Sequence, residues 1–140
     1  MIGKHCIRTY SSTQTTVSLS SGEAEYYGIV KGSSNALGLI GMLGDIGVCS
    51  SVVVCTDASA AKGIASRRGL GKVRHIELCE LWLQDQVARG KIQLVKICGE
   101  DNISDSLTKP PDADRILQTM RWTHHSVECG RHAIMPNVVE

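Results

Sequence analysis

Apolar residues change their spacing several times along this chain, and each change predicts a different element. Alternating and β-branched residues over 6–19 predict one or two strands with a polar turn at Ser11–Gln14. From Ser20 onward, apolar residues recur at three- and four-residue spacing, which predicts a long helix that breaks near 41–44 and stops at Gly47. The first third of the chain therefore predicts a β region followed by a helix.

The middle of the chain alternates apolar runs with helical patterns. SVVVCTD (51–57) is a continuous apolar run typical of a strand buried on both faces. A helix is predicted for 58–66, an amphipathic helix capped by Gly90 for 76–90, and another strand for 92–97. This order predicts an α/β fold with a mixed sheet.

The last part of the chain predicts two helices and a tail. GEDNISDSLTKPP (99–111) predicts a loop and a short helix that starts at Asp101 and ends at the prolines. DADRILQTMRWT predicts a second helix, and the residues after it have no periodicity, so we expect a poorly ordered end. The expected organisation is an α/β domain over 1–110 and a C-terminal helix and tail over 111–140.

Composition places this chain among ordinary globular proteins. Its 140 residues suit one domain, and 42% hydrophobic with 21% charged residues is typical of a soluble protein. No apolar run is long enough to cross a bilayer, and the N-terminus has no signal or transit pattern. We therefore expect no membrane partner and an intracellular location, in the cytoplasm or nucleus.

The six cysteines contain no Cys-x-x-Cys pair, which argues against a zinc ribbon or redox motif. Cys55 and Cys98 fall within apolar runs, and we expect them to be small buried hydrophobic residues.

Positive charge gathers in one stretch although the net charge is only +1. Residues 58–75 contain no acidic residue and carry Lys62, Arg67, Arg68, Lys72, Arg74 and His75. A phosphate backbone would suit such a stretch. The alternative is that it forms a solvated loop.

Two glutamates lie one residue apart at the start of the long helix. Ser20 followed by Glu23 matches a capping box, in which each side chain bonds to a backbone N–H of the other residue. Glu25 points about 200° away around the helix and has no such explanation.

Three acids share a placement near strand ends and helix starts, where ligands gather in open α/β sheets. They are Glu25, Asp57 and Asp105. Converging carboxylates need a neutralising cation, and hard oxygen ligands favour Mg²⁺ or Mn²⁺. Each acid also has a structural alternative: Glu25 as a solvated residue, Asp57 as a helix N-cap, and Asp105 as the partner of Lys109.

Spacing alone does not decide between these alternatives, and four longer segments of the chain bear on them. They are SSTQTTVSLSSGEAEYYG, VVVCTDASAAKGIA, GLGKVRHIEL with LWLQD, and EDNISDSLTKP. Together they resemble the ribonuclease H domain of copia-type retrotransposon Pol polyproteins over residues 3–110. The resemblance implies a five-stranded mixed sheet flanked by helices, and metal-dependent hydrolysis of the RNA strand of an RNA–DNA hybrid during reverse transcription.

The resemblance also assigns roles to particular residues. It implies that Glu25, Asp57 and Asp105 are the catalytic, metal-binding carboxylates, holding Mg²⁺ or Mn²⁺. The Arg74-His75-Ile76 segment is similar to a Lys-His-Ile segment of the family, which makes His75 a candidate nucleic-acid contact. With Lys72 and Arg74 it forms the expected nucleic-acid-binding set.

One departure from the family changes the expected activity. The family carries its first metal-binding aspartate on the first, central strand, whereas residues 1–22 here contain no Asp or Glu. We therefore expect an N-terminally truncated copy that lacks this strand and is impaired in hydrolysis. The rest of a Pol polyprotein, or another chain, would supply the strand. The alternatives are a non-catalytic nucleic-acid-binding remnant and a strand-pairing remnant.

Overall fold

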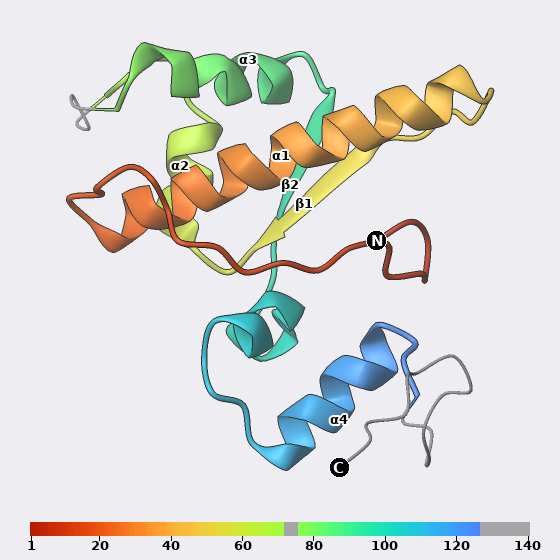
Figure 1. Cartoon of the computed structure of the whole chain (residues 1–140). Helices are drawn as coiled ribbons and strands as arrows, with labels where there is room; N and C mark the ends of the chain where they lie inside the picture. Colours follow the sequence, from red (N-terminus) through yellow and green to blue (C-terminus); the bar gives the residue numbers. More distant parts are fainter. Residues whose placement is uncertain (72–75, 127–140) are drawn as a thin grey trace, which may run out of the picture. The chain divides into compact units, whose positions relative to one another are not determined.

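The structure is a computed structural model that describes residues 1–71 and 76–126. The chain divides into two compact units (Figure 1). The sheet unit is Ser12–Asn102, and the C-terminal unit is Met1–Ser11 together with Ile103–Glu140.

The sheet unit follows the order of elements predicted from Ser20 onward. Its elements are α1 (Ser21–Asp45), β1 (Val52–Thr56), α2 (Ser59–Ala65), the 3-10 turn η1 (Leu78–Leu81), α3 (Trp82–Ala88), β2 (Ile92–Lys96) and the 3-10 turn η2 (Gly99–Asp101). α1 continues through 41–44 without the predicted break. Gly47 and Gly90 follow α1 and α3 with left-handed φ of 81° and 71°, which confirms both predicted helix ends.

β1 and β2 form a parallel two-stranded sheet in which Val52 lies opposite Ile92 and Thr56 opposite Lys96. The chain crosses from one strand to the other through α2, η1 and α3. The predicted combination of helices and strands is therefore confirmed. The two described strands are parallel to each other, and the predicted mixed sheet stays a prediction.

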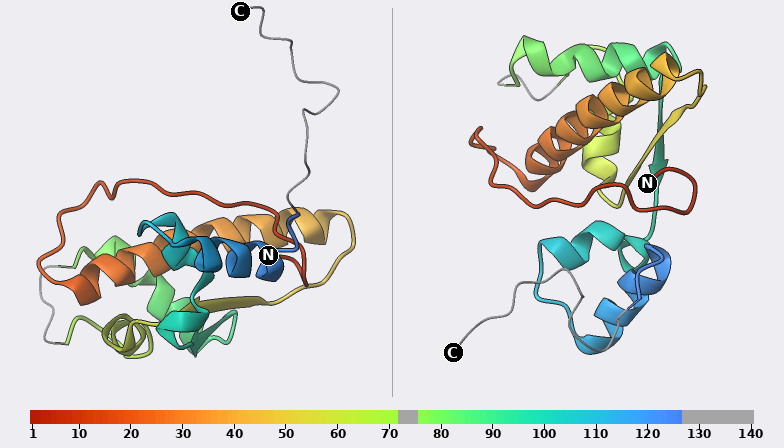
Figure 2. Two further views of the ribbon diagram at one scale, coloured as in Figure 1. Left: turned by 90° about the horizontal axis from the view of Figure 1, so that it is seen from below. Right: turned by 45° about the vertical axis from the view of Figure 1, so that its right-hand side comes forward.

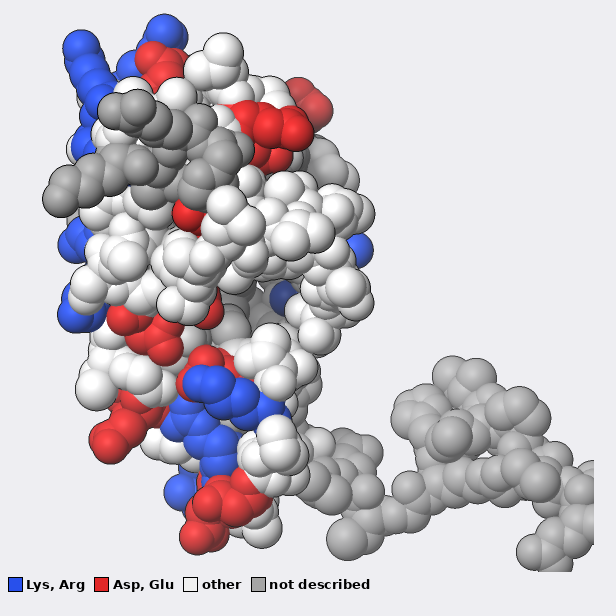
Figure 3. All heavy atoms as spheres, turned by 90° about the vertical axis from the view of Figure 1, so that its left-hand side faces the viewer, with Lys and Arg blue, Asp and Glu red and all other residues white. Residues whose placement is uncertain are grey.

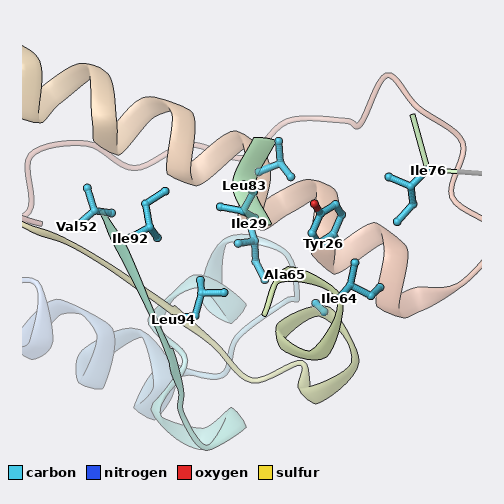
Figure 4. Packing of buried hydrophobic residues seen from close by; sticks show 11 residues of the cluster. Tyr26, Ile29, Val52, Ile64, Ala65, Ile76, Leu83, Ile92 and Leu94 are labelled. Atoms are coloured by element: carbon cyan, nitrogen blue, oxygen red, sulfur yellow. The ribbon is translucent and has the colours of Figure 1, made fainter. Parts of the chain in front are cut away.

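One face of the sheet carries the hydrophobic core. Side chains of both strands join those of three helices in one cluster: Tyr26, Ile29, Val30, Val52, Ala61, Ile64, Ala65, Ile76, Leu83, Ile92 and Leu94. Figure 4 shows Val52, Ile92 and Leu94 on the side of the strands that faces α1, and Figures 1 and 2 show α1 lying along one side of β1. Burying each large apolar side chain contributes about 1.5–3 kcal/mol, so this cluster is the main stabilising feature of the unit.

The opposite face of β1 is exposed, and the prediction of a strand buried on both faces is wrong. Val53 is 52% exposed, and Cys55 is exposed on the same face. Cys98 is also exposed, contrary to prediction. A continuous apolar run lacks the period that would distinguish one buried face from two.

Residues 6–19 form no strand, which contradicts the prediction for this segment. An isolated antiparallel bridge joins Ile2 and His5, and no regular element follows it before α1. Val17 is 86% exposed and Leu19 is 72% exposed. Strand preference depends on packing against neighbours, and these side chains have no buried surface to pack on.

The C-terminal unit contains the 3-10 turn η3 (Ile103–Leu107) and α4 (Ala113–Trp122), so the predicted second helix is confirmed. Asp112 caps α4, because its Oδ1 accepts a hydrogen bond from the Arg115 N–H at 2.8 Å. The Thr119 hydroxyl donates to the Ser106 hydroxyl at 3.0 Å and joins the two elements. The second segment of this unit begins at Ile103, and the predicted tail from 127 onward lies outside the described residues.

Gly22 marks the closest approach of α1 to α2. A Cβ built at Gly22 would lie 2.9 Å from the Ala60 Cβ, which is closer than two side-chain carbons pack. At Gly28, two turns further along α1, nothing lies within 4 Å of the same position.

These two glycines predict opposite effects of one substitution. Gly22→Ala should lower the free energy of unfolding by about 1–3 kcal/mol, because α1 and α2 must move apart. Gly28→Ala should raise it by about 0.5–1 kcal/mol, because alanine favours the helix and meets open space. Urea unfolding followed by circular dichroism measures both, and equal shifts would contradict the close packing at Gly22.

Candidate functional site

The two glutamates at the start of α1 have separate roles. The Ser20 hydroxyl accepts a hydrogen bond from the Glu23 N–H at 3.3 Å, and Glu23 Oε2 accepts one from the Leu19 N–H at 2.9 Å. Glu23 is only 3% exposed. The predicted capping role is therefore confirmed, with Leu19 in place of Ser20 as the second donor. Glu25 is exposed on another side of α1.

Asp57 lies directly after β1, but it does not cap α2. The N-cap of α2 is Ala58, whose N–H donates to the Thr56 hydroxyl at 3.1 Å. The structural alternative for Asp57 is therefore wrong. Its side chain is half-buried, and within residues 1–71 and 76–126 no hydrogen bond or ion pair involves its carboxylate.

The loop that follows β2 lies beside Asp57. Since β1 and β2 are parallel, their carboxyl ends lie at one edge of the sheet. The Ile97 N–H donates to the Thr56 carbonyl at 3.0 Å, and a Cβ built at Gly99 would lie 3.7 Å from Asp57 Oδ2. Ligands of open α/β sheets gather at this edge, so the carboxylate occupies a position suited to binding.

Asp105 lies in η3, in the C-terminal unit, whereas Glu25 and Asp57 lie in the sheet unit. Its carboxylate forms an ion pair with the Lys109 ammonium at 2.7 Å, as its structural alternative predicted. Among the described residues, no three His, Cys, Asp or Glu side chains are placed to hold one metal ion. The convergence of the three carboxylates stays a prediction.

Half of the basic stretch can be placed. Lys72, Arg74 and His75 lie outside the described residues. Arg68 is exposed, and Arg67 is half-buried with its Nη2 donating to the Leu70 carbonyl at 2.6 Å. On the face shown in Figure 3, both signs of charge are present and most of the surface is uncharged. Arg68 is thus better placed than Arg67 for contact with a phosphate.

Gln84 contributes to this region, and the sequence reasoning missed it. It lies on α3, is 6% exposed, and bonds through its side-chain amide to the loop that carries Arg68. The sequence contained only a weak signal for this role. Gln84 is a polar residue beside the apolar stripe of an amphipathic helix, and the glycine-rich loop before this helix has backbone groups that need partners.

Burial and hydrogen bonding raise the pKa of three groups near α1 and η1. The Tyr26 hydroxyl donates to the Glu80 carbonyl at 2.7 Å, and burial raises the pKa of Tyr26 to about 12. Burial, followed by the charge of Glu23, raises the pKa of Tyr27. A hydrogen bond to the Glu77 carboxylate raises the pKa of the Cys79 thiol. Cys79 is therefore held as a thiol, which is a poor nucleophile.

No protein-family model, curated protein or solved structure matches this chain. Within residues 1–71 and 76–126, none of the helices combines the length and the apolar character that crossing a bilayer requires.

The Tyr26 hydroxyl predicts a pH-dependent part of the stability. Tyr26 has a pKa of about 12 in the fold against 10.0 ordinarily, so its neutral form is favoured in the fold. The stabilisation by the neutral hydroxyl is complete below pH 10.0, the ordinary pKa, and is lost as the pH rises through about 12, the pKa in the fold. Tyr26→Phe should cost about 1 kcal/mol at pH 7. Urea unfolding from pH 7 upward should show wild type and variant converging above about pH 10, and a constant difference would contradict the assignment.

Proposed function

We propose that this chain is a retroelement-derived domain of the ribonuclease H type, which binds RNA–DNA hybrids and hydrolyses their RNA strand weakly or not at all. The observation that carries the proposal is the state of Asp57. Its half-buried carboxylate lies at the carboxyl edge of a parallel sheet, caps no helix and has no partner among the described residues. A carboxylate held in this way is suited to bind a cation.

The metal expected at this site is Mg²⁺ or Mn²⁺. Glu25, Asp57 and Asp105 would hold it, and carboxylate oxygens are the ligands that these ions prefer. When bound, such ions activate water and stabilise the leaving oxygen of a phosphodiester. Asp105 would have to exchange its ion pair with Lys109 for the cation.

The weak hydrolysis would follow from an incomplete set of metal ligands. The first metal-binding aspartate of the family has no counterpart in residues 1–22, which contain no Asp or Glu. Catalytic groups misplaced by about 1 Å can cost a hundredfold in rate. Binding of the hybrid needs less exact placement of these groups than hydrolysis does, so binding would be retained.

The basic stretch would supply the binding of the hybrid. Lys72, Arg74 and His75 are the proposed contacts, and the exposed Arg68 lies just before them in the sequence. Selectivity for a strand of RNA would come from contacts to 2′-hydroxyl groups in the shallow minor groove.

A second candidate function is pairing with a strand supplied by another chain, such as the rest of a Pol polyprotein. The edges of the sheet favour it, because each of its two described strands pairs with one described neighbour, and a further strand would bond to the backbone groups along the other edge. Small sheets of this kind need further strands or packing to be stable. The binding measurement below separates the candidates, because strand pairing requires no affinity for nucleic acid.

If the basic stretch contacts phosphates, affinity for a hybrid should fall steeply with salt. Fluorescence anisotropy with a short labelled RNA–DNA hybrid, between about 50 and 200 mM salt, gives the slope. Arg74→Glu should flatten the slope by about 1, the value expected for one lost phosphate contact.

Lys91→Glu is the matched control, because Lys91 is exposed after α3 and outside the basic stretch. It should leave the slope unchanged. Absence of binding at low salt would reject the proposed function and favour strand pairing.

If Asp57 is a metal ligand, its removal should weaken metal binding irrespective of catalysis. Titration with Mn²⁺, followed by electron paramagnetic resonance of the free ion, should show affinity at least about tenfold lower for Asp57→Asn. Asp45→Asn is the control, because this exposed residue ends α1 and carries the same charge change.

Equal Mn²⁺ affinities in Asp57→Asn and wild type would remove Asp57 from the proposed site. A gel assay with the hybrid and Mg²⁺ tests the remaining claim, and rapid cleavage by residues 1–140 would show that hydrolysis is unimpaired.

A further inference from the structure

Gln84 is a buried polar side chain whose hydrogen bonds reach α2 and the loop after it. Its Nε2 donates to the Ile64 carbonyl at 2.9 Å and to the Gly69 carbonyl at 3.1 Å. Its Oε1 accepts from the Gly69 N–H at 2.8 Å. Both amide protons and the carbonyl are therefore used, and the reverse orientation of the amide would place its oxygen against two carbonyl oxygens.

The loop that Gln84 holds, residues 66–71, has a conformation that few sequences can adopt. Gly69 and Gly71 have left-handed φ of 79° and 58°. A Cβ at Gly71 would lie 2.7 Å from Arg67 Cζ, so the guanidinium lies directly against this glycine. Arg67 also donates to the Leu70 carbonyl, and the half-buried Leu70 packs against the core.

These contacts leave Arg68 as the exposed basic residue of this loop. Arg67 is occupied within the loop, and Leu70 points to the core. A loop that is already ordered loses less conformational entropy when it binds than a flexible one does.

We infer that Gln84 is a positioning residue for nucleic-acid binding: its amide fixes the turn at Gly69 and so presents Arg68 to a phosphate in one conformation. This inference rests on the proposed function for its ligand, an RNA–DNA hybrid. Gln84 is itself 6% exposed, so it acts through the loop and does not contact the hybrid.

Gln84→Met tests the inference, because methionine fills a similar volume and makes none of the three hydrogen bonds. Affinity for the labelled hybrid should fall about tenfold, and exchange of the Gly69 amide proton, followed by nuclear magnetic resonance, should accelerate by a similar factor. Gln86→Met is the matched control, because Gln86 lies on the same helix and its side chain bonds, among the described residues, only to Asp85 at 3.3 Å. Gln86→Met should change neither quantity.

A second variant keeps the test decisive if Gln84→Met fails to fold. Gly69→Ala strains the same turn from the loop side, and Gly90→Ala is its control, because both glycines have left-handed φ and nothing within 4 Å of a built Cβ. Gly69→Ala should weaken binding of the hybrid several-fold more than Gly90→Ala does, at equal folded fraction.

The outcomes separate this inference from the proposed function. Hybrid binding by Gln84→Met or Gly69→Ala as tight as that of its control overturns the inference, and so does unchanged exchange at Gly69 in Gln84→Met. A wild-type chain that binds no hybrid overturns the proposed function and the positioning role with it. In that case faster exchange at Gly69 in Gln84→Met would still show that the amide orders the loop.

Discussion

Parallel pairing of β1 with β2 forces the chain between them to cross the sheet, because parallel strands cannot be joined by a tight turn. The crossover through α2, η1 and α3 returns against the same sheet face that α1 covers, and the core forms there. Two consequences follow from this single constraint. The opposite face of the sheet stays exposed at Val53, and both strands end at the same edge.

Asp57 lies at the edge of the sheet where β1 and β2 both end, and this position makes it a candidate ligand. The residue follows a strand whose neighbour ends beside it, and Gly99 leaves the carboxylate uncovered on that side. Aspartates that begin helices are usually explained by capping, but Ala58 occupies the capping position here. Under the proposed function, a cation bound at this edge would compensate the partly buried charge of Asp57.

The crossover also explains why a polar residue lies in the core. α3 packs against α2, and residues 66–71 after α2 turn at two glycines with left-handed φ, Gly69 and Gly71. Backbone groups turned away from water need hydrogen-bond partners, and the buried Gln84 amide bonds to those of Gly69 and Ile64. The same bonds that stabilise the packing therefore shape the loop that exposes Arg68.

The sequence by itself determined the features that depend on nearby residues. The Ser20–Glu23 cap, the stops at Gly47 and Gly90, and the two apolar strands follow from interactions within a few positions of the chain. The exposure of Val53, the lack of a strand at 6–19 and the hydrogen bonds of Gln84 were decided by tertiary structure, because each depends on which distant segments lie beside it. The same distinction holds for the candidate site. The sequence identified Asp57 as a candidate ligand, whereas the parallel pairing of β1 with β2 placed Gly99 beside it. Spacing along a chain records local geometry, whereas burial and hydrogen bonding between distant segments depend on the folded neighbours.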